Sequence, residues 1–180
     1  MTRPCRRTSG GFGIISLMSS PKEVEDDLLL ERQLCFALTA ASRTVISAYR
    51  PVLQELDLTH PQYLVMLALW ERSPRSVKDI SAELLLGPAT LSPLLKRLEA
   101  AGYLTRKRLP KDERSLAVSL TPAGTALRAK ALAVPATMLD KLGLSREEAR
   151  ELHHAMTRLT RAAQADPDGA VADTGEPSGR

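Results

Sequence analysis

Residues 59–121 constrain the fold more than any other part of this sequence. They contain three segments with apolar residues at helical spacing, and each segment opens with residues typical of a helix start. Two runs typical of strands follow them, so we expect three short helices and then a two-stranded hairpin. The helix starts are Thr59–Gln62, Ser76–Asp79 and Gly87-Pro88, the strands are Tyr103–Leu109 and Leu116–Leu120, and a charged turn runs from Pro110 to Arg114.

The third of these predicted helices has one apolar face and one cationic face. Four leucines at spacings of three and four should face the core, which leaves Lys96 and Arg97 outside. Pro93 should lie in or just after the first turn, where its missing N–H matters least. Gly102 suits a left-handed C-terminal cap. The four leucines are Leu91, Leu94, Leu95 and Leu98.

Positive charge is concentrated in and after this helix. Between Lys96 and Arg114 there are seven basic and three acidic residues, and the difference of +4 equals the net charge of the whole chain. Charged residues make up 26% of the chain, and outside Lys96–Arg114 their positive and negative charges cancel. Localised positive charge indicates a polyanion-binding site, although a charge run is more often a solvated face.

Helices, hairpin and charge together are typical of a winged helix-turn-helix, which puts one helix in the DNA major groove and the hairpin loop in the minor groove. Side chains at the start of the third helix can reach base edges or phosphates, and its cations can neutralise phosphates. Arg114 is placed to enter the minor groove, with Asp112 orienting it. The alternative is an ordinary surface ion pair between these two. The residues expected to contact DNA are Thr90, Ser92, Lys96, Arg97, Lys111, Asp112 and Arg114.

The segment from 20 to 50 should be a dimerisation helix. It can start at the Ser20–Glu23 capping box or at Asp26-Asp27, and it should end near Tyr49 because Pro51 interferes with continuation. Its apolar residues cover more than one face, so it needs a second partner, and we expect another subunit. One face carries Leu34, Leu38, Ala41, Val45 and Ala48, and the other carries Phe36, Ile46 and Tyr49.

Residues 121–163 should supply the other dimerisation helices. Thr121-Pro122 opens a helix in which Gly124 allows close packing, and Pro135 should kink or end it. Ser145–Glu148 caps the last helix, whose apolar positions are Leu152, Ala155, Met156 and Leu159.

The ends of the chain should be disordered, over residues 1–19 and 164–180. Within residues 1–19, either Met1 or Met18 can be the initiator methionine. No apolar run approaches the roughly 20 residues that span a bilayer. Two cysteines, Cys5 and Cys35, are too few for a disulfide scaffold, so we expect a cytoplasmic protein with no membrane partner.

The sequence resembles the MarR family of winged-helix repressors from about Leu28 to Leu159. The resemblance rests on Leu120–Gly124 (LTPAG), Asp112–Arg114 (DER) and the stretch LSPLLKRLEAAGYL from Leu91. It implies a homodimer with intertwined terminal helices, bound to a pseudo-palindromic operator. It also implies that Arg114 reads the minor groove and that Asp112 supports it.

One branch of the family is more similar, the organic-hydroperoxide sensors called OhrR. The matching segments are Gln33–Leu38, Ala40–Arg43 and Tyr49–Glu71. The resemblance implies that Cys35 reacts with peroxide and that two tyrosines of the partner subunit bond its thiolate. One matches Tyr49, and the other position is His60, a departure. A third family tyrosine is Thr39 here.

The residues alone support a reactive Cys35 less strongly, because a lone helical cysteine is usually a small buried hydrophobe. A nearby helix start, donors from Tyr49 and His60, and exposure at a dimer seam would favour the thiolate. Oxidation would give a sulfenic acid that a low-molecular-weight thiol caps, and Cys35 is followed by no second cysteine. The added bulk would re-space recognition helices that must sit ~34 Å apart.

We therefore expect a mainly α homodimer with a small β-hairpin wing, acting as a repressor that senses organic hydroperoxide through Cys35. One alternative is a regulator of the same fold that is released by a small phenolic or aromatic acid. Another is a one-cysteine peroxidase, but an enzyme is not expected. No cofactor is expected either, since His153-His154 are adjacent and point to different faces of a helix.

Overall fold

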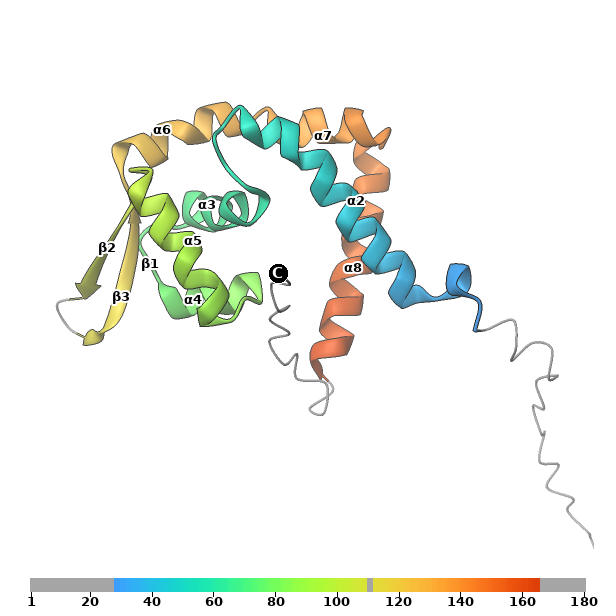
Figure 1. The fold of residues 1–180 in the computed structure, drawn as a ribbon, viewed down its shortest axis with the longest axis horizontal. Coiled ribbons are helices and arrows are strands. Elements are labelled where there is room, and N and C mark those ends of the chain that lie inside the picture. The colour runs from blue at the N-terminus through green and yellow to red at the C-terminus, as the bar shows by residue number, and fades with distance from the viewer. Residues whose placement is uncertain (1–27, 110–111, 166–180) are drawn as a thin grey trace, which may run out of the picture. The chain divides into compact units, whose positions relative to one another are not determined.

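A computed structural model describes residues 28–109 and 112–165, and it divides into two compact units, residues 1–43 and 44–180. Most of the described residues are helical (Figure 1). The helices are η1 (Leu30–Arg32, a 3-10 turn), α2 (Leu34–Gln54), α3 (His60–Glu71), α4 (Val77–Leu84), α5 (Pro88–Ala100), α6 (Pro122–Ala131), α7 (Val134–Leu142) and α8 (Arg146–Ala165). The strands are β1 (Arg75–Ser76), β2 (Leu104–Leu109) and β3 (Asp112–Leu120).

The first long helix differs at both ends from the sequence prediction. Residues 28–33 hold only η1, so no continuous helix runs from residue 20 or 26 into α2; those predicted starts lie outside the described residues. At the other end, α2 continues through Pro51 to Gln54, and the prediction that it stops near Tyr49 is wrong. A proline removes one backbone hydrogen bond, and Leu53, fully buried in the core, is the residue that holds this last turn in place.

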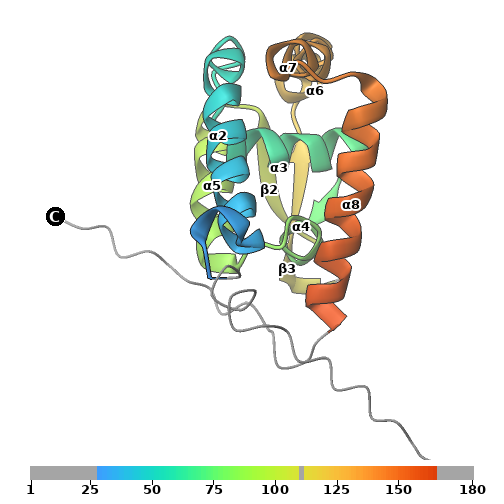
Figure 2. The same ribbon diagram turned by 90° about the vertical axis from the view of Figure 1, so that its right-hand side faces the viewer.

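The core of the second unit is built by α3, α4 and α5 on one side of the sheet (Figure 2). The four leucines predicted to face inward on α5 are all buried, so its apolar face was predicted correctly. They pack with Leu53, Val65, Met66 and Ile80, each fully buried. This packing fixes α5 against α3 and leaves the opposite face of α5 in solvent.

The sheet has three strands in the order β1-β3-β2, all antiparallel. The predicted hairpin is present as β2 and β3, with Leu104 opposite Leu120 and Arg106 opposite Val118. β1 was not predicted, because two residues are too few for an alternating pattern. β3 already begins at Asp112, so the predicted charged turn from Pro110 to Arg114 is wrong for its last three residues.

The predicted helix starts are confirmed by hydrogen bonds. The Thr59 amide donates to the Gln62 carboxamide oxygen over 2.8 Å, and the Asp79 amide donates to the Ser76 hydroxyl over 3.0 Å. Ser145 and Glu148 cap α8 in the same reciprocal way. Gly87 precedes α5 with Pro88 as its first residue, as the sequence indicated.

α6 is pinned to the base of the hairpin. The Thr121 hydroxyl accepts from the Gly124 amide, and it donates to the Gly102 carbonyl over 2.6 Å. A Cβ on Gly124 would lie 2.0 Å from the Tyr103 carbonyl oxygen, so the predicted close approach is confirmed. α6 ends at Ala131, and Pro135 lies in the first turn of α7, so the helix breaks just before this proline.

α8 contributes no buried residue to the described part of the chain. Its apolar stripe is instead open to solvent, with Leu152 50% and Met156 43% exposed. The helix extends two residues beyond the predicted boundary at 163. None of the described helices is long and apolar enough to cross a membrane.

Candidate functional site

The outer face of α5 carries the predicted DNA contacts. Thr90, Ser92, Lys96 and Arg97 are all exposed, while the leucines between them are buried. Thr90 lies in the first turn, at the helix N-terminus, where backbone N–H groups also favour anions. Within the described residues, neither Lys96 nor Arg97 has an ion-pair partner. This face therefore offers hydroxyls at one end and free cations at the other.

Arg106, one of the seven basic residues counted in the sequence, is already neutralised. Its guanidinium donates to the Glu99 carboxylate over 2.6 and 2.9 Å, and its backbone amide donates to the same group over 2.9 Å. The Arg106 hydrogen bonds hold the pKa of Glu99 below its usual range. Glu99 lies in the last turn of α5 and Arg106 belongs to β2, so this pair ties the hairpin to the helix rather than binding phosphate.

The predicted hairpin contacts are only partly described. Asp112 and Arg114 belong to the backbone of β3, whose pairing with β2 becomes irregular between Arg108 and Leu109. The side chains of residues 108–115 and the whole of Lys111 lie outside the described residues. The orientation of Arg114 by Asp112 stays a prediction.

Arg75 was not predicted as a site residue, and it is the one charged side chain that is buried among the described residues. Its guanidinium donates to the Ala68 carbonyl over 3.1 Å and to the Glu83 carboxylate. It therefore joins β1 and α3 to the end of α4, and it fixes the first helix of the helix-turn-helix pair. A basic residue beside Ser73-Pro74 gave no signal of burial in the sequence.

Cys35 belongs to the first unit and is the second residue of α2. The thiol is unbridged and exposed. Thr39, the position of the third family tyrosine, donates its hydroxyl to the Cys35 carbonyl over 2.8 Å. Leu34 and Phe36 beside it are 60% and 42% exposed, so the predicted apolar faces of this helix are uncovered in the single chain.

Tyr49 and His60 belong to the second unit and lie side by side. Their ring centroids are 5.3 Å apart with the planes at 63°, an edge-to-face contact. Partial burial raises the pKa of Tyr49 and lowers the pKa of His60. At neutral pH the phenol thus keeps its O–H and the imidazole stays uncharged with one N–H, so both are hydrogen-bond donors. Both residues were expected from the sequence to be hydrogen-bond donors, and in the fold their rings are in contact.

A cleft of about 390 Å³ opens beside His60. Ile46, Leu58 and Pro61 give it an apolar part, and Arg50 is its one cation. The polar side chains of Gln54, Thr59 and His60 complete the lining. Organic molecules with a short apolar body fit a cleft of this kind.

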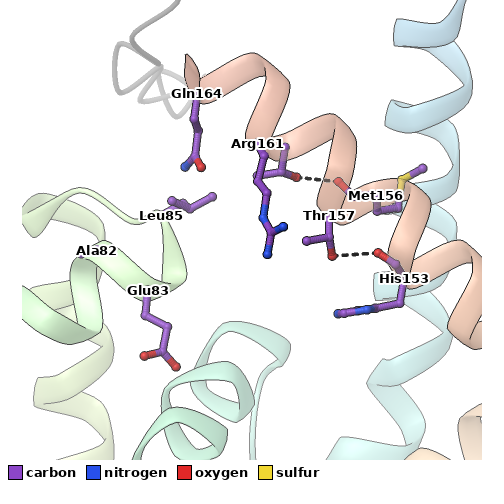
Figure 3. Close-up of a pocket in the computed structure, with 9 residues that line it drawn as sticks. Ala82, Glu83, Leu85, His153, Met156, Thr157, Arg161 and Gln164 are labelled. Carbon is purple, nitrogen blue, oxygen red and sulfur yellow. Dashed lines mark hydrogen bonds between the residues drawn. The ribbon is translucent and has the colours of Figure 1, made fainter. Parts of the chain in front are cut away.

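A second cleft, of about 440 Å³, separates α4 from α8 (Figure 3). Thr157 and Thr160 turn their hydroxyls back to carbonyls of α8, at 2.8 and 2.9 Å. Arg161 and His153 extend from α8, and Glu83 on the α4 side is engaged by Arg75. Six of the nine residues that line this cleft are polar or charged, and neither Tyr49 nor His60 is among them.

Residues 58–116 match the model of the MarR family. The organic hydroperoxide resistance transcriptional regulator of Bacillus subtilis is 44% identical over 134 residues, which cover 74% of this chain and 91% of that protein. The regulator SarZ of Staphylococcus saprophyticus is 36% identical over 132 residues, covering 73% of this chain and 90% of SarZ.

Solved structures show the same architecture. Reduced AbfR bound to DNA superposes with a TM-score of 0.65 at 30% identity, over 78% of this chain and 97% of AbfR. The similarity extends over more of the chain than residues 59–121, so it includes segments outside the winged-helix module.

Proposed function

Because the chain belongs to the MarR family of transcriptional regulators, we propose that it is a repressor whose DNA binding is switched off by organic hydroperoxide at Cys35. The observation that carries the proposal is the pair Tyr49–His60, two neutral donors whose ring centroids are 5.3 Å apart, in a chain whose Cys35 thiol is exposed. The regulator from Bacillus subtilis named above supports the choice of oxidant.

DNA binding is supported by the outer face of α5. Hydroxyls at its start and cations further along suit a major groove in which base edges and phosphates are contacted by one helix. AbfR, which superposes on this chain, was solved bound to DNA. We propose that Thr90, Ser92, Lys96 and Arg97 contact the operator from the major groove. Lys111, Asp112 and Arg114 would contact it from the hairpin.

A homodimer is supported by the apolar side chains that α2 and α8 leave uncovered. A soluble monomer rarely exposes so many large apolar residues along two helices. A second copy would bury them by pairing the same helices, which is the self-complementary contact of a two-fold dimer. A dimer would also present two α5 helices to the two halves of a pseudo-palindromic operator.

The redox step is a displacement at oxygen. The Cys35 thiolate attacks the terminal oxygen of ROOH, the O–O bond breaks, and sulfur becomes a sulfenic acid. The departing alkoxide takes up the proton that the thiol had released to solvent and leaves as the alcohol ROH. A low-molecular-weight thiol then condenses with the sulfenic acid to give a mixed disulfide and water. Tyr49 and His60 of a second copy would donate hydrogen bonds to the thiolate before the reaction and would be displaced by the bulk added afterwards.

The test of this proposal is Cys35→Ser. The variant should bind DNA like the wild type and stay bound in cumene hydroperoxide with added cysteine, whereas the wild type should lose at least about tenfold in affinity. Binding is followed by the anisotropy of a labelled duplex selected from a random-sequence pool by the reduced protein. Release of Cys35→Ser by the peroxide would refute the proposal.

The cleft beside His60 favours a second candidate, a regulator released by a small aromatic acid without thiol chemistry. The apolar side chains of its lining suit a small ring, and Arg50 suits the carboxylate of that ring. Arg50→Met would abolish release by salicylate if this candidate were right, and it would leave release by cumene hydroperoxide unchanged if the thiol is the sensor.

A further inference from the structure

The Tyr49–His60 pair is the start of a continuous row of rings. Tyr49 lies 6.3 Å from Tyr63, and Tyr63 lies 6.2 Å from Trp70, in both cases between ring centroids. The chain has only six Phe, Trp and Tyr residues, and three of them belong to this row. The row therefore uses half of the strongly aromatic side chains of a chain whose core is otherwise aliphatic.

The row ends on the backbone of α6. The Trp70 indole N–H donates to the Gly124 carbonyl over 2.8 Å, a contact between residues 54 positions apart. Gly124 belongs to the first turn of α6, directly after β3. The indole thus connects α3 to the helix that follows the hairpin.

Gly124 has no free space on its other side. A Cβ there would lie 2.0 Å from the Tyr103 carbonyl oxygen and 3.2 Å from Leu120, the residues at the base of β2 and β3. The Thr121 amide donates to the same Tyr103 carbonyl over 3.0 Å. Because the contact is backbone against backbone, a shift of Gly124 has to move the hairpin base.

The flank of the row, in contrast, is open. Tyr63 and Trp70 line a cleft of about 340 Å³ together with Leu67 and Leu132, which are 41% and 65% exposed. Rings in close-packed interiors are held by their neighbours, whereas rings beside an open cleft have room to reorient. Tyr63 itself is buried, so the room to reorient lies beside the half-buried Trp70, whose indole is tied to Gly124 at the end of the row.

We propose that Trp70 is a positioning residue that couples the Tyr49–His60 pair to the hairpin base, so that displacement of the pair on oxidation of Cys35 re-aims the hairpin. This coupling rests on the proposed function. Oxidation displaces Tyr49, Tyr63 follows, and the indole carries the change to Gly124 through its hydrogen bond. The hairpin then loses its DNA-bound orientation relative to α5.

Trp70→Phe tests the coupling, because it keeps an aromatic ring and removes the N–H donor. The experiment uses the full chain in a Cys5→Ser background, which leaves Cys35 as its only cysteine. Cumene hydroperoxide and cysteine are added, intact mass reports oxidation, and anisotropy of the selected duplex reports release. Trp70→Phe should become oxidised to the wild-type extent and bind DNA within about threefold before oxidation, but lose less than about threefold afterwards.

A control separates coupling from stability. Ile80→Val shortens a fully buried side chain of α4 that does not belong to the row, and it should keep the full loss of affinity on oxidation. Full release of Trp70→Phe would overturn the coupling alone. A wild type that is oxidised at Cys35 and stays on DNA would overturn the proposed function and the coupling with it.

The fluorescence of Trp70 can be measured directly, since it is the only tryptophan of the chain. Its emission should shift when Cys35 is oxidised in the absence of DNA, and this shift should be lost in Tyr63→Leu. An emission spectrum unchanged by complete oxidation would overturn the coupling, whatever happens to DNA binding.

Discussion

His60 illustrates how one residue can be tuned by its surroundings. Partial burial lowers the pKa of its imidazole below the ordinary 6.5 because the charged form is poorly solvated there. As the folded pKa is the lower one, the unfolded chain binds more protons once the pH falls through about 6.5. The free energy of unfolding should therefore decrease as the pH is lowered from 7.5 to 5.5.

Urea unfolding of His60→Gln and the wild type at these two pH values measures this effect. The variant should lose less stability than the wild type on acidification, because glutamine has no proton to gain. His154→Gln, on the exposed surface of α8, is the matched control and should retain the wild-type pH dependence. A wild-type slope in His60→Gln would contradict the assignment to His60.

The candidate thiol site could be predicted only in part from the residues themselves. Cys35 by itself is an ordinary helical cysteine, and the resemblance to a peroxide sensor came from the sequence around it. The 5.3 Å contact of Tyr49 with His60 depends on how α2 turns into α3, which no spacing rule gives. Arg75 was missed because burial of a cation is decided by tertiary contacts with Ala68 and Glu83.

At the scale of elements, two glycines separate a steric requirement from a conformational one. Gly102 has φ +78° and open space around its Cα, whereas Gly124 has a carbonyl oxygen where a Cβ would be. Alanine at Gly102 should cost about 1 kcal/mol, because only the backbone conformation is disfavoured. Alanine at Gly124 should cost about 3 kcal/mol, because backbone must move away from backbone.

The midpoint and slope of urea unfolding measure both variants. Gly124→Ala should be the less stable of the two. Equal stability, or a less stable Gly102→Ala, would show that α6 does not press on the hairpin base as described.

The elements that the sequence predicted well are those with chemical start signals. Thr59, Ser76, Thr121 and Ser145 each precede a helix and bond its first turn, so the pattern and the geometry have the same cause. Two features of the fold were not predicted, each for a physical reason. Pro51 costs α2 one hydrogen bond, which burial of Leu53 offsets, and β1 exists only because β3 is there to pair with it.

At the scale of the whole molecule, the uncovered stripe of α8 predicts association. Glutamates at Leu152 and Met156 would place two charges in the proposed interface, where their desolvation is unfavourable. The double variant Leu152→Glu, Met156→Glu should shift the protein from two chains of 19.6 kDa to one. Light scattering after size exclusion measures the mass, and circular dichroism checks that helicity persists.

Leu116→Glu is the matched control, since Leu116 is also exposed but belongs to β3. It should leave the mass unchanged. A double variant that kept the wild-type mass would show that α8 is not part of the interface.

Modification of the Cys35 sulfur and release of DNA can be measured together in one titration. Reduced Cys5→Ser protein on its selected duplex receives cumene hydroperoxide in substoichiometric steps with excess cysteine, and each step is divided between intact mass and anisotropy. The fraction of DNA released should rise with the fraction of chains that carry one modification at Cys35. Complete modification with the DNA still bound, or release while the thiol is intact, would contradict it.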